Sequence, residues 1–405
     1  MDTPAAPKTI EQLREDLATF FADPYPTYQE LRAQTPAKLE FIPPGMVPGL
    51  DGPLSTWALM NHDDVFNALR DHETFTSARN LFVEKGLFPQ LVLIMDDPPR
   101  HTRFRRLVNK AFTLRRVESL EPWITTIANE LLDNLGPGET DIVQAYTTPL
   151  PVQIIARLMG IPAADQATFK RWSDTFISSL VSISLEDRMR NTMEMAEYFG
   201  KIAAARRDQG AEDLITALVE AEIDGESLQD WEILAFCILL LIAGNETTTN
   251  LVGNMLNIFA DRPALWQQLR EDRSLVEPAI EETLRYHSPV QQLMRMTTRE
   301  VEVSGVTIPA DEMVTVFFGA ANRDPKEFPN PDEFRLDRDL RNHVSFGVGI
   351  HYCLGAPLAR AEARITLNAL LDRFSVIEHG AAPAVRQTQS PVVFGFQQLP
   401  LILQS

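Results

Sequence analysis

The spacing of apolar and polar residues along the chain predicts a mainly helical protein. Apolar residues recur at three- and four-residue intervals through most of the sequence, which is the period of a helix with one buried face. Runs of Pro and Gly separate these segments. The predicted helices cover residues 61–70, 99–111, 116–135, 151–159, 164–180, 188–207, 228–260, 263–270, 276–286 and 356–374.

Short segments rich in strand-forming residues flank the helical block. They lie at residues 56–60, 301–303, 306–308 and 313–319, and near both ends of the last thirty residues. We therefore expect a mainly α fold with small peripheral β-sheets (α+β). No strong linker divides the chain, so we expect one domain over residues 1–405. Its parts are a β-richer segment of about 1–70, a helical core of about 95–290 and a C-terminal part of about 291–405.

Composition and charge narrow the class of protein. The chain has 405 residues, of which 44% are hydrophobic, so it can bury a large core. It has 37 basic and 56 acidic residues, a formal charge of -19, which disfavours nucleic acids and anionic membranes as partners. The apolar stretch at 233–243 is shorter than the roughly 20 residues that cross a bilayer. Because the N-terminus also has no signal-like apolar core, we expect a cytoplasmic bacterial monomer.

The chain has two cysteines, and they are in different surroundings. Cys237 lies in an apolar run, where a buried free thiol is expected, and the two are too far apart in sequence to suggest a disulfide framework. Cys353 lies in the glycine-rich segment SFGVGIHYCLG, just before an amphipathic run. Gly347 and Gly349 allow backbone conformations closed to other residues. The N-terminal amides of the following helix are expected to lower the pKa of Cys353 and stabilise a thiolate.

This segment resembles the haem-binding pattern of the cytochrome P-450 family, F-x-x-G-x-[HR]-x-C-x-G. The fixed positions are filled by Phe346, Gly349, His351, Cys353 and Gly355. The resemblance implies the cytochrome P-450 fold, with haem b between the oxygen-activation helix and the helix after the cysteine loop. It also implies that the thiolate of Cys353 binds the iron. The plainer alternative is a cysteine buried on a glycine loop without a cofactor.

A second motif lies in the apolar run that ends in AGNETTT. It resembles the family's oxygen-activation pattern A-G-x-[DE]-T, which Ala243, Gly244, Glu246 and Thr247 fill. A carboxylate beside a hydroxyl suits proton delivery, and the resemblance implies that Thr247 orients the dioxygen ligand while Glu246 connects it to solvent. Two features depart from the commonest pattern, Glu in place of Asp and Asn245 before it, and either can alter the water relay. An exposed helix end is the alternative interpretation.

A third motif is a pair of opposite charges, Glu282 and Arg285, that share a helix face at i, i+3 spacing. Alone, such a pair is typical of a solvated helix. Followed by NRDPKEFPNPDEFRLDR, it resembles the family's E-x-x-R motif and the meander behind the haem. The resemblance implies a structural pair that contacts Arg338 or a nearby residue.

Haem propionates need cationic or hydrogen-bonding partners, because a carboxylate that enters a protein interior carries a large desolvation cost. The segment DDPPRHTRFRR places His101 and Arg105 on one helix face, and it resembles the start of the family's third helix. Arg295 and His351 match further propionate ligands, although each residue alone is typical of a surface charge. The remaining cofactor-binding residues that the resemblance implies are Phe346, Gly349, Gly355 and Ala243.

The resemblance implies a haem-thiolate monooxygenase that hydroxylates an apolar small molecule with O2. Two electrons would come from an external [2Fe–2S] ferredoxin and its reductase, because no flavin or nicotinamide domain fits beside the haem fold. The apolar character of the candidate pocket favours a terpenoid, steroid, aromatic or fatty compound. Its candidate residues are Phe82, Val83, Leu91, Leu93, Leu239, Ile242, Ala243, Val290, Leu293, Val393 and Phe394.

A local group of cations can steer an acidic ferredoxin despite the net negative charge. The candidates are Arg103, Arg106, Lys110, Arg115, Arg116 and Arg360. A haem-thiolate protein that only binds or senses a ligand is the alternative function. It would keep Cys353 but would not need Glu246 beside Thr247. Peroxide-driven turnover without a donor is a variant of the monooxygenase hypothesis.

Overall fold

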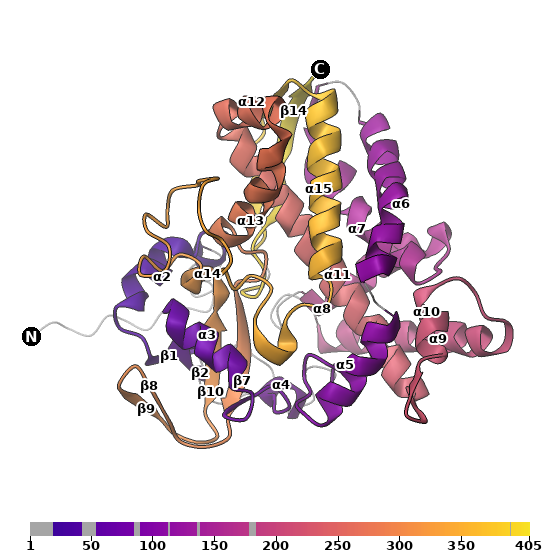
Figure 1. The fold of residues 1–405 in the computed structure, drawn as a ribbon, viewed down its shortest axis with the longest axis vertical. Helices are drawn as coiled ribbons and strands as arrows, with labels where there is room; N and C mark the ends of the chain where they lie inside the picture. Colours follow the sequence, from indigo (N-terminus) through magenta and orange to yellow (C-terminus); the bar gives the residue numbers. More distant parts are fainter. Residues whose placement is uncertain are drawn as a thin grey trace, which may run out of the picture.

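The computed structural model describes residues 19–42, 54–84, 90–111, 114–135, 138–177, 184–388 and 390–405. Helices account for most of this part of the chain (Figure 1). They are α2 (Tyr25–Arg32), α3 (His62–Arg70), α4 (Leu81–Glu84), α5 (Arg100–Ala111), α6 (Leu114–Asp133), α7 (Pro149–Leu158), α8 (Gln166–Ile177), α9 (Leu185–Gln209), α10 (Leu214–Val219), α11 (Asp230–Ala260), α12 (Pro263–Glu271), α13 (Val276–Tyr286), α14 (Phe318–Ala321) and α15 (Ala356–Arg373).

The largest described sheet joins the two ends of the chain. Its order is β1-β2-β10-β7-β3, and β10 pairs with β2 in parallel while its other neighbouring pairs are antiparallel. Figure 1 shows its N-terminal strands in indigo and violet beside C-terminal strands in orange, at the lower left. The strands are β1 (Ala37–Ile42), β2 (Leu54–Leu59), β3 (Phe75–Thr76), β7 (Gln292–Thr297) and β10 (Met313–Phe317).

Smaller sheets lie elsewhere in the described chain. One is β11-β14-β4, and the others are the pairs β12-β13, β5-β6 and β8-β9. Their strands are β4 (Glu139–Asp141), β5 (Glu222–Ile223), β6 (Glu226–Ser227), β8 (Val301–Val303), β9 (Val306–Ile308), β11 (Val376–His379), β12 (Val385–Arg386), β13 (Phe396–Gln398) and β14 (Pro400–Gln404).

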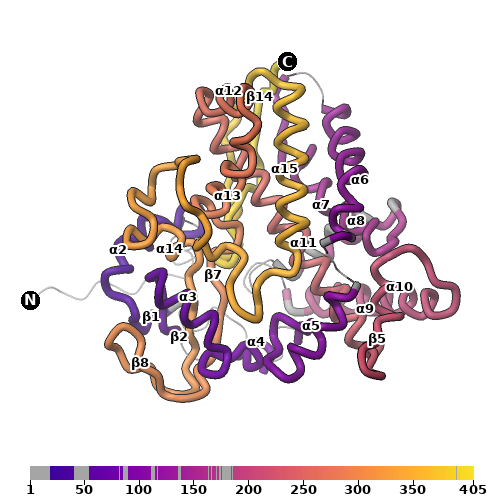
Figure 2. Tube along the Cα trace, viewed as in Figure 1, coloured from indigo at the N-terminus to yellow at the C-terminus, as the bar shows by residue number. Residues whose placement is uncertain are grey.

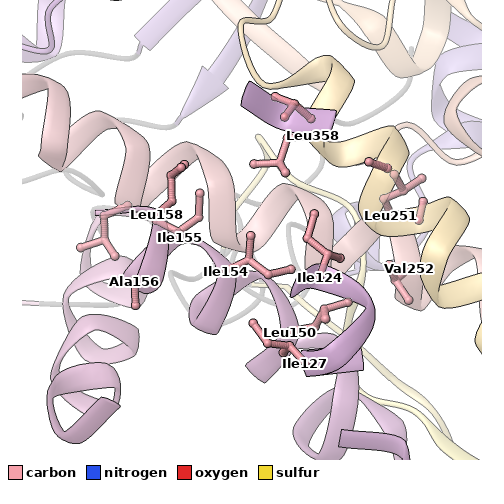
Figure 3. Close-up of a cluster of buried hydrophobic side chains, with 14 of the residues drawn as sticks. Ile124, Ile127, Leu150, Ile154, Ile155, Ala156, Leu158, Leu251, Val252 and Leu358 are labelled. Atoms are coloured by element: carbon pink, nitrogen blue, oxygen red, sulfur yellow. The ribbon is translucent and has the colours of Figure 1, made fainter. Parts of the chain in front are cut away.

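The main hydrophobic core lies where α6, α7, α11 and α15 meet. Figure 3 shows Ile124 and Ile127 from α6 close to Ile154 from α7, with Leu251 from α11 and Leu358 from α15 near them. These side chains are buried, as the helical spacing of apolar residues predicts. The trace in Figure 2 shows α11 passing behind α15 through the centre of the molecule.

Helix α11 is the long apolar helix of the core. It begins with a capping box, in which Glu232 and Gln229 satisfy each other's backbone amides. Of the helices in the described residues, it is the one long and apolar enough to cross a membrane. Its most apolar window is 56% buried inside the protein, which is also typical of the core helix of a soluble protein.

The structure confirms the predicted fold class, and the predicted helices agree with it to within a few residues where the chain is described. Residues 178–180 of the helix predicted at 164–180 lie outside the described residues. The segment expected at 228–260 is α11, and the segment expected at 356–374 is α15. The predicted strand at 313–319 ends at Phe317, after which the chain forms the short helix α14. The sequence pattern did not predict α2, β1, β7, the β5–β6 pair or the π-helical turn Val143–Thr147.

Candidate functional site

The loop before α15 is shaped by glycines at close backbone contacts. Gly349 has a φ of +71°, and a Cβ there would lie 3.0 Å from the Leu69 carbonyl oxygen at the end of α3. The amide of Cys353 donates to the Phe346 carbonyl over 2.9 Å, which closes the loop. Gly355 lies two residues after Cys353, and α15 begins at the next residue, Ala356. The loop therefore holds the sulfur of Cys353 at the N-terminal end of α15.

The pKa of Cys353 reflects two opposing effects. Burial raises the pKa of this thiol above its ordinary value, although the amides of Gly355 and Ala356 and the charge of Arg105 act in the opposite direction. The amides therefore act in the predicted direction, but within the protein alone the cost of burying the charged form exceeds their effect. A thiolate here needs a further cation beside the sulfur, and a metal ion that coordinates a thiol supplies one.

Helix α11 is accessible on one face in the middle of the core. Ala243 is exposed, whereas Leu241 and Asn245 beside it are buried. Thr247, one turn later, is partly exposed, and its Oγ1 donates to the Ala243 carbonyl oxygen over 2.6 Å. Glu246 is also partly exposed. The acid and hydroxyl of the second motif therefore lie where a bound group can reach them.

Around this accessible face, α11 packs tightly on its neighbours. A Cβ at Gly244 would lie 2.8 Å from Ile155 Cδ1 on α7, so the glycine allows the two helices to approach. Thr249 donates to the Thr147 carbonyl oxygen over 2.9 Å. Both side-chain amide atoms of the buried Asn245 have no hydrogen-bond partner within the described residues. Buried amides are normally satisfied, so this departure from the family pattern leaves hydrogen-bonding capacity next to Glu246.

Arg295 is a buried cation with no carboxylate in ion-pair contact among the described residues. It lies on β7, its side chain is 5% exposed, and Nη1 donates over 2.8 Å to the carbonyl of the preceding residue. In the part of the chain that the structure describes, no carboxylate lies within ion-pair distance of it. Burial lowers its pKa to about 10, with Asp97 acting in the opposite direction. A buried arginine of this kind suits an anionic ligand.

Two histidines beside the cysteine loop also keep unused hydrogen-bonding atoms. The rings of His101 on α5 and His351 are 4.7 Å apart. Neither ring nitrogen of His101, nor Nε2 of His351, has a hydrogen-bond partner among the described residues. Burial, followed by the charges of His351 and Arg105, lowers the pKa of His101 to about 4. Together with Arg295, these donors fit two carboxylates of a bound group, as the propionates of haem require.

Asp97 is a residue of this site that the sequence did not reveal. Its Oδ1 lies 3.9 Å from His351 Nε2. Burial acts to raise the pKa of Asp97, but His351, Thr76 and the amide of Ser77 outweigh it and lower the value to about 2. The segment DDPPRH could have indicated its role, because it places Asp97 four residues before His101.

Glu282 and Arg285 lie in a fully buried ion cluster. Both side chains are 0% exposed, and Arg285 donates from Nε and Nη2 to the two carboxylate oxygens of Glu282 over 2.7 and 2.8 Å. Arg338 donates to Glu282 Oε1 over 3.2 Å, and so does the amide of Arg335 over 2.9 Å. Arg285 also donates to the carbonyl oxygens of Asn322, Pro331 and Glu333.

The candidate pocket residues lie in three kinds of surroundings. Leu91, Leu93 and Leu239 are buried in the main core, and Ile242 packs against it. Val290 and Leu293 pack against the core cluster of the large sheet, and Val290 forms an isolated bridge with Val393. Val83 is partly exposed, and the side chain of Phe82 lies outside the described part. Phe394 packs against Tyr25 and His287, with ring centroids 5.4 and 5.1 Å apart.

Comparisons with known proteins agree with this arrangement. Residues 149–404 match the family model described as Cytochrome P-450. The chain is 38% identical to Cytochrome P-450 109 of Bacillus spizizenii, over 97% of this chain and 94% of that protein. It is 36% identical to a vitamin D(3) 25-hydroxylase of Pseudonocardia autotrophica, over 95% of each. The crystal structure of CYP109E1 from Bacillus megaterium in complex with testosterone matches with a TM-score of 0.81 at 36% identity, over 94% of this chain and 99% of that one.

The fold and the site define a haem-binding oxidoreductase of the thiolate class. The chain belongs to the cytochrome P-450 family. It carries haem b, and it is a monooxygenase that incorporates molecular oxygen into a small-molecule substrate with electrons from redox partners.

Proposed function

We propose that Cys353 is the iron ligand of a monooxygenase that hydroxylates apolar compounds of steroid or related terpenoid type. The observation that carries the assignment is the group formed by Arg295, His101 and His351. It offers a buried cation and unused ring nitrogens to an anionic ligand, next to the loop that holds Cys353. The accessible turn of α11 at Thr247 supplies the catalytic hydroxyl of the same site.

The protein holds haem in two ways: cationic side chains bind its negatively charged propionates, and small residues fit against its flat ring. Arg105 and Arg295 bind the propionates as cations, and His101 and His351 hydrogen-bond to them. Phe346, Gly349, Gly355 and Ala243 border the ring, since small residues there let a flat group approach the backbone. Haem bound through a thiolate would supply O–O bond cleavage and the oxidation of unactivated C–H bonds.

Thr247 and Glu246 are the side chains that deliver protons in this proposal. Thr247 Oγ1 already donates to the Ala243 carbonyl oxygen within its own helix, so the hydroxyl is held at a fixed position on the accessible face. Its oxygen can accept a proton from the solvent side and pass one on. Glu246 connects this hydroxyl to solvent, and the buried Asn245 keeps unpaired amide atoms on another side of the same turn.

The substrate class rests on the apolar candidate pocket and on two relatives. Leu239 and Ile242 on α11, and Val290 and Leu293 near β7, present hydrocarbon and no charge. One relative is crystallised with testosterone, and another is named for hydroxylation of vitamin D(3). Both compounds are large and mostly apolar, and both belong to the steroids or to compounds related to them. A steroid-like compound is therefore favoured over a small aromatic compound, a sugar or a nucleotide.

We further propose an acidic [2Fe–2S] ferredoxin with its reductase as the electron donor, and a monomer of one domain in the bacterial cytoplasm. The pairing of β2 with β10 supports one domain, because it joins segments from the two ends of the chain. The net charge of -19 supports a protein that stays away from nucleic acid and from membranes.

The proposed substrate class is tested by measuring ligand binding to a panel of compounds and then product formation from those that bind. The purified haem protein is titrated with testosterone, a vitamin D compound, a long-chain fatty acid and, as a control, a sugar nucleotide. We expect the steroid-like compounds to displace water from the ferric iron and shift the absorption spectrum, and then to gain one oxygen atom with ferredoxin, reductase and NADPH.

Thr247→Ala separates the proposal from its alternative. In this variant we expect the spectral shift to remain while peroxide is released in place of product, because binding does not need the hydroxyl and proton delivery does. A ligand-binding or sensor protein would shift its spectrum without forming product in either form. That outcome contradicts the proposed oxygenation of this substrate class, as does a shift caused by the sugar nucleotide alone.

A further inference from the structure

Helix α5 presents a row of cations on one face. Arg103, Arg106 and Lys110 are spaced i, i+3 and i+7, so they share that face. Arg105 lies on another side of the helix, where it donates from Nη2 to the Tyr352 carbonyl oxygen over 2.9 Å. Tyr352 is 41% exposed and directly precedes Cys353. The row of cations, here called the α5 cationic face, therefore belongs to the same helix that contacts the cysteine loop.

An acidic hairpin lies against this face. Strands β5 and β6 are joined by Asp224 and Gly225, whose φ angles of 56° and 79° are those of a tight two-residue hairpin turn. Elements α5 and β5 are in contact, and Figure 2 shows β5 next to the helix. Glu222 and Glu226 flank the turn, so the hairpin carries acids at alternate positions.

Each cation of the α5 cationic face contacts a different residue of the hairpin. The contacts are Arg103 Nε to Glu226 Oε2 at 3.0 Å, Arg106 Nη2 to Asp224 Oδ2 at 3.0 Å, and Lys110 Nζ to the Glu222 carbonyl oxygen at 2.8 Å. Arg103 also contacts the largely buried Glu232 at 2.8 Å. The spacing of the hairpin thus follows the spacing of the helix face, and the hairpin covers the charges that an acidic partner would use.

The contacts at the hairpin tip are weak and easily exchanged. Asp224 and Glu226 are 80% and 61% exposed at their side chains, so water and salt screen both ion pairs. A hairpin with two residues in each strand is marginal by itself. Its base is fixed, because Ala221 and Leu228 are buried in the main core. The tip can therefore leave the helix while the base stays in place.

We propose that the β5–β6 hairpin is an internal competitor for the acidic electron donor. When the donor docks, its carboxylates replace Asp224 on Arg106 and Glu226 on Arg103, and the hairpin tip moves away from α5. Arg103 stays oriented during the exchange because Glu232 continues to hold it. This inference rests on the proposed ferredoxin partner, and it adds that the docking surface is covered before the donor arrives.

The test uses the haem-containing, substrate-bound enzyme and a reduced acidic [2Fe–2S] ferredoxin. The hairpin variant is Asp224→Asn with Glu226→Gln, and the face variant is Arg106→Gln. The matched control is Glu197→Gln with Asp372→Asn, which removes two exposed, ion-paired carboxylates from α9 and the far end of α15. The first electron transfer is followed by stopped flow against ferredoxin concentration, and peroxide-driven turnover checks that each variant is otherwise intact.

We expect the hairpin variant to lower the apparent Kd for ferredoxin by about threefold to tenfold relative to the control variant, because two competing carboxylates are gone. The gain should vanish at about 1 M salt, where charges are screened beyond about 3 Å. Arg106→Gln should raise the apparent Kd, and it should abolish the gain when combined with the hairpin variant.

Two results overturn the inference in different ways. If Arg106→Gln weakens binding but the hairpin variant matches its control, the donor uses the α5 cationic face and the hairpin does not compete. If ferredoxin reduces the wild type and neither change affects it, the donor docks elsewhere, and the proposed monooxygenase function stands. Failure of ferredoxin to reduce even the wild type, with peroxide turnover intact, contradicts the proposed donor and the inference together.

Discussion

At the residue scale, the buried ionisable side chains of Arg295 and Glu362 differ in how the protein accommodates them. Arg295 is charged at neutral pH, with a pKa lowered only to about 10, and it has no described carboxylate partner. Glu362 on α15 is 1% exposed, and its Oε2 has no hydrogen-bond partner within the described residues. The first is explained by an anionic cofactor. The second persists as a neutral acid because burial raises its pKa to about 8.

Arg295→Met should affect the protein with and without haem in opposite directions. Without haem, the variant should be at least as stable as the wild type, since it removes a buried charge that has no ion-pair partner among the described residues. With haem, the loss of a charge-assisted hydrogen bond should weaken binding by about 1.5–3 kcal/mol, roughly tenfold to a hundredfold. Haem transfer to an acceptor protein and thermal unfolding of the haem-free form measure the two effects. Equal haem retention in variant and wild type would remove Arg295 from the propionate site.

Glu362→Gln should change how stability depends on pH. The pKa of Glu362 is raised in the folded protein, so its stabilising contribution is complete below the pKa of the unfolded chain and is lost as pH rises toward about 8. Across that window the wild type should lose about 1.4 kcal/mol per pH unit relative to the glutamine variant. Denaturant unfolding at several pH values measures the difference, and the exposed Glu378→Gln is the control. A difference that does not depend on pH would mean that Glu362 is ionised in the fold.

At the element scale, the cysteine loop depends on one close backbone contact with α3. A Cβ at Gly349 would lie 3.0 Å from the Leu69 carbonyl oxygen and 3.3 Å from Arg70 Cα, and neither atom belongs to a movable side chain. Gly305 has a similar φ of +80°, but a Cβ there would meet nothing within 4 Å. A side chain at either glycine would therefore pay the cost of the left-handed backbone conformation. Only at Gly349 would it also meet the backbone of α3.

Gly349→Ala should therefore destabilise the protein more than Gly305→Ala does. The conformation alone should cost about 1–2 kcal/mol at both positions, and the contact with α3 should add about 1–3 kcal/mol at Gly349. Thermal unfolding of the two haem-loaded variants gives the comparison, and the haem content of the Gly349 variant should also fall. Equal destabilisation would show that the loop and α3 can separate freely.

The buried ion cluster joins helix α13 to the segment that precedes the cysteine loop. Glu282→Gln keeps the shape of the side chain but leaves Arg285 charged at 0% exposure, which should cost about 3–5 kcal/mol. Asp337→Asn, in an exposed pair with Arg335, should change stability little. Chemical denaturation of both variants is the measurement, and a small effect at Glu282 would mean that the cluster relaxes or takes up water.

The elements also show how far the sequence predicts the fold. Helices α11 and α15 were predictable because their apolar residues repeat over many turns. Strand β7 was not, because QLMRMT lies between sheet partners that come from distant parts of the chain. The motifs located Cys353 and Thr247. The role of Asp97 follows from hydrogen-bonding neighbours that the fold brings together, and that of Glu362 follows from burial. No local pattern encodes either, nor the burial that raises the pKa of Cys353.

At the scale of the whole molecule, distant segments combine to make one site. The central helix supplies the accessible face at Ala243 and Thr247, and the loop before α15 supplies Cys353. Helix α5 and strand β7 add His101 and Arg295. The acids that give the chain its net charge of -19 include those of the β5–β6 hairpin, so the charge distribution also shapes the surface beside α5.

The central claim is that Cys353 binds the iron, and the two cysteines of the chain allow a direct test. The ferrous carbonyl spectrum of Cys353→His is compared with that of Cys237→Ser, whose thiol is buried in α11 with a pKa raised by burial. We predict that the Cys353 variant loses the thiolate-type spectrum and that the Cys237 variant keeps it. A thiolate-type spectrum in the Cys353 variant would contradict the claim.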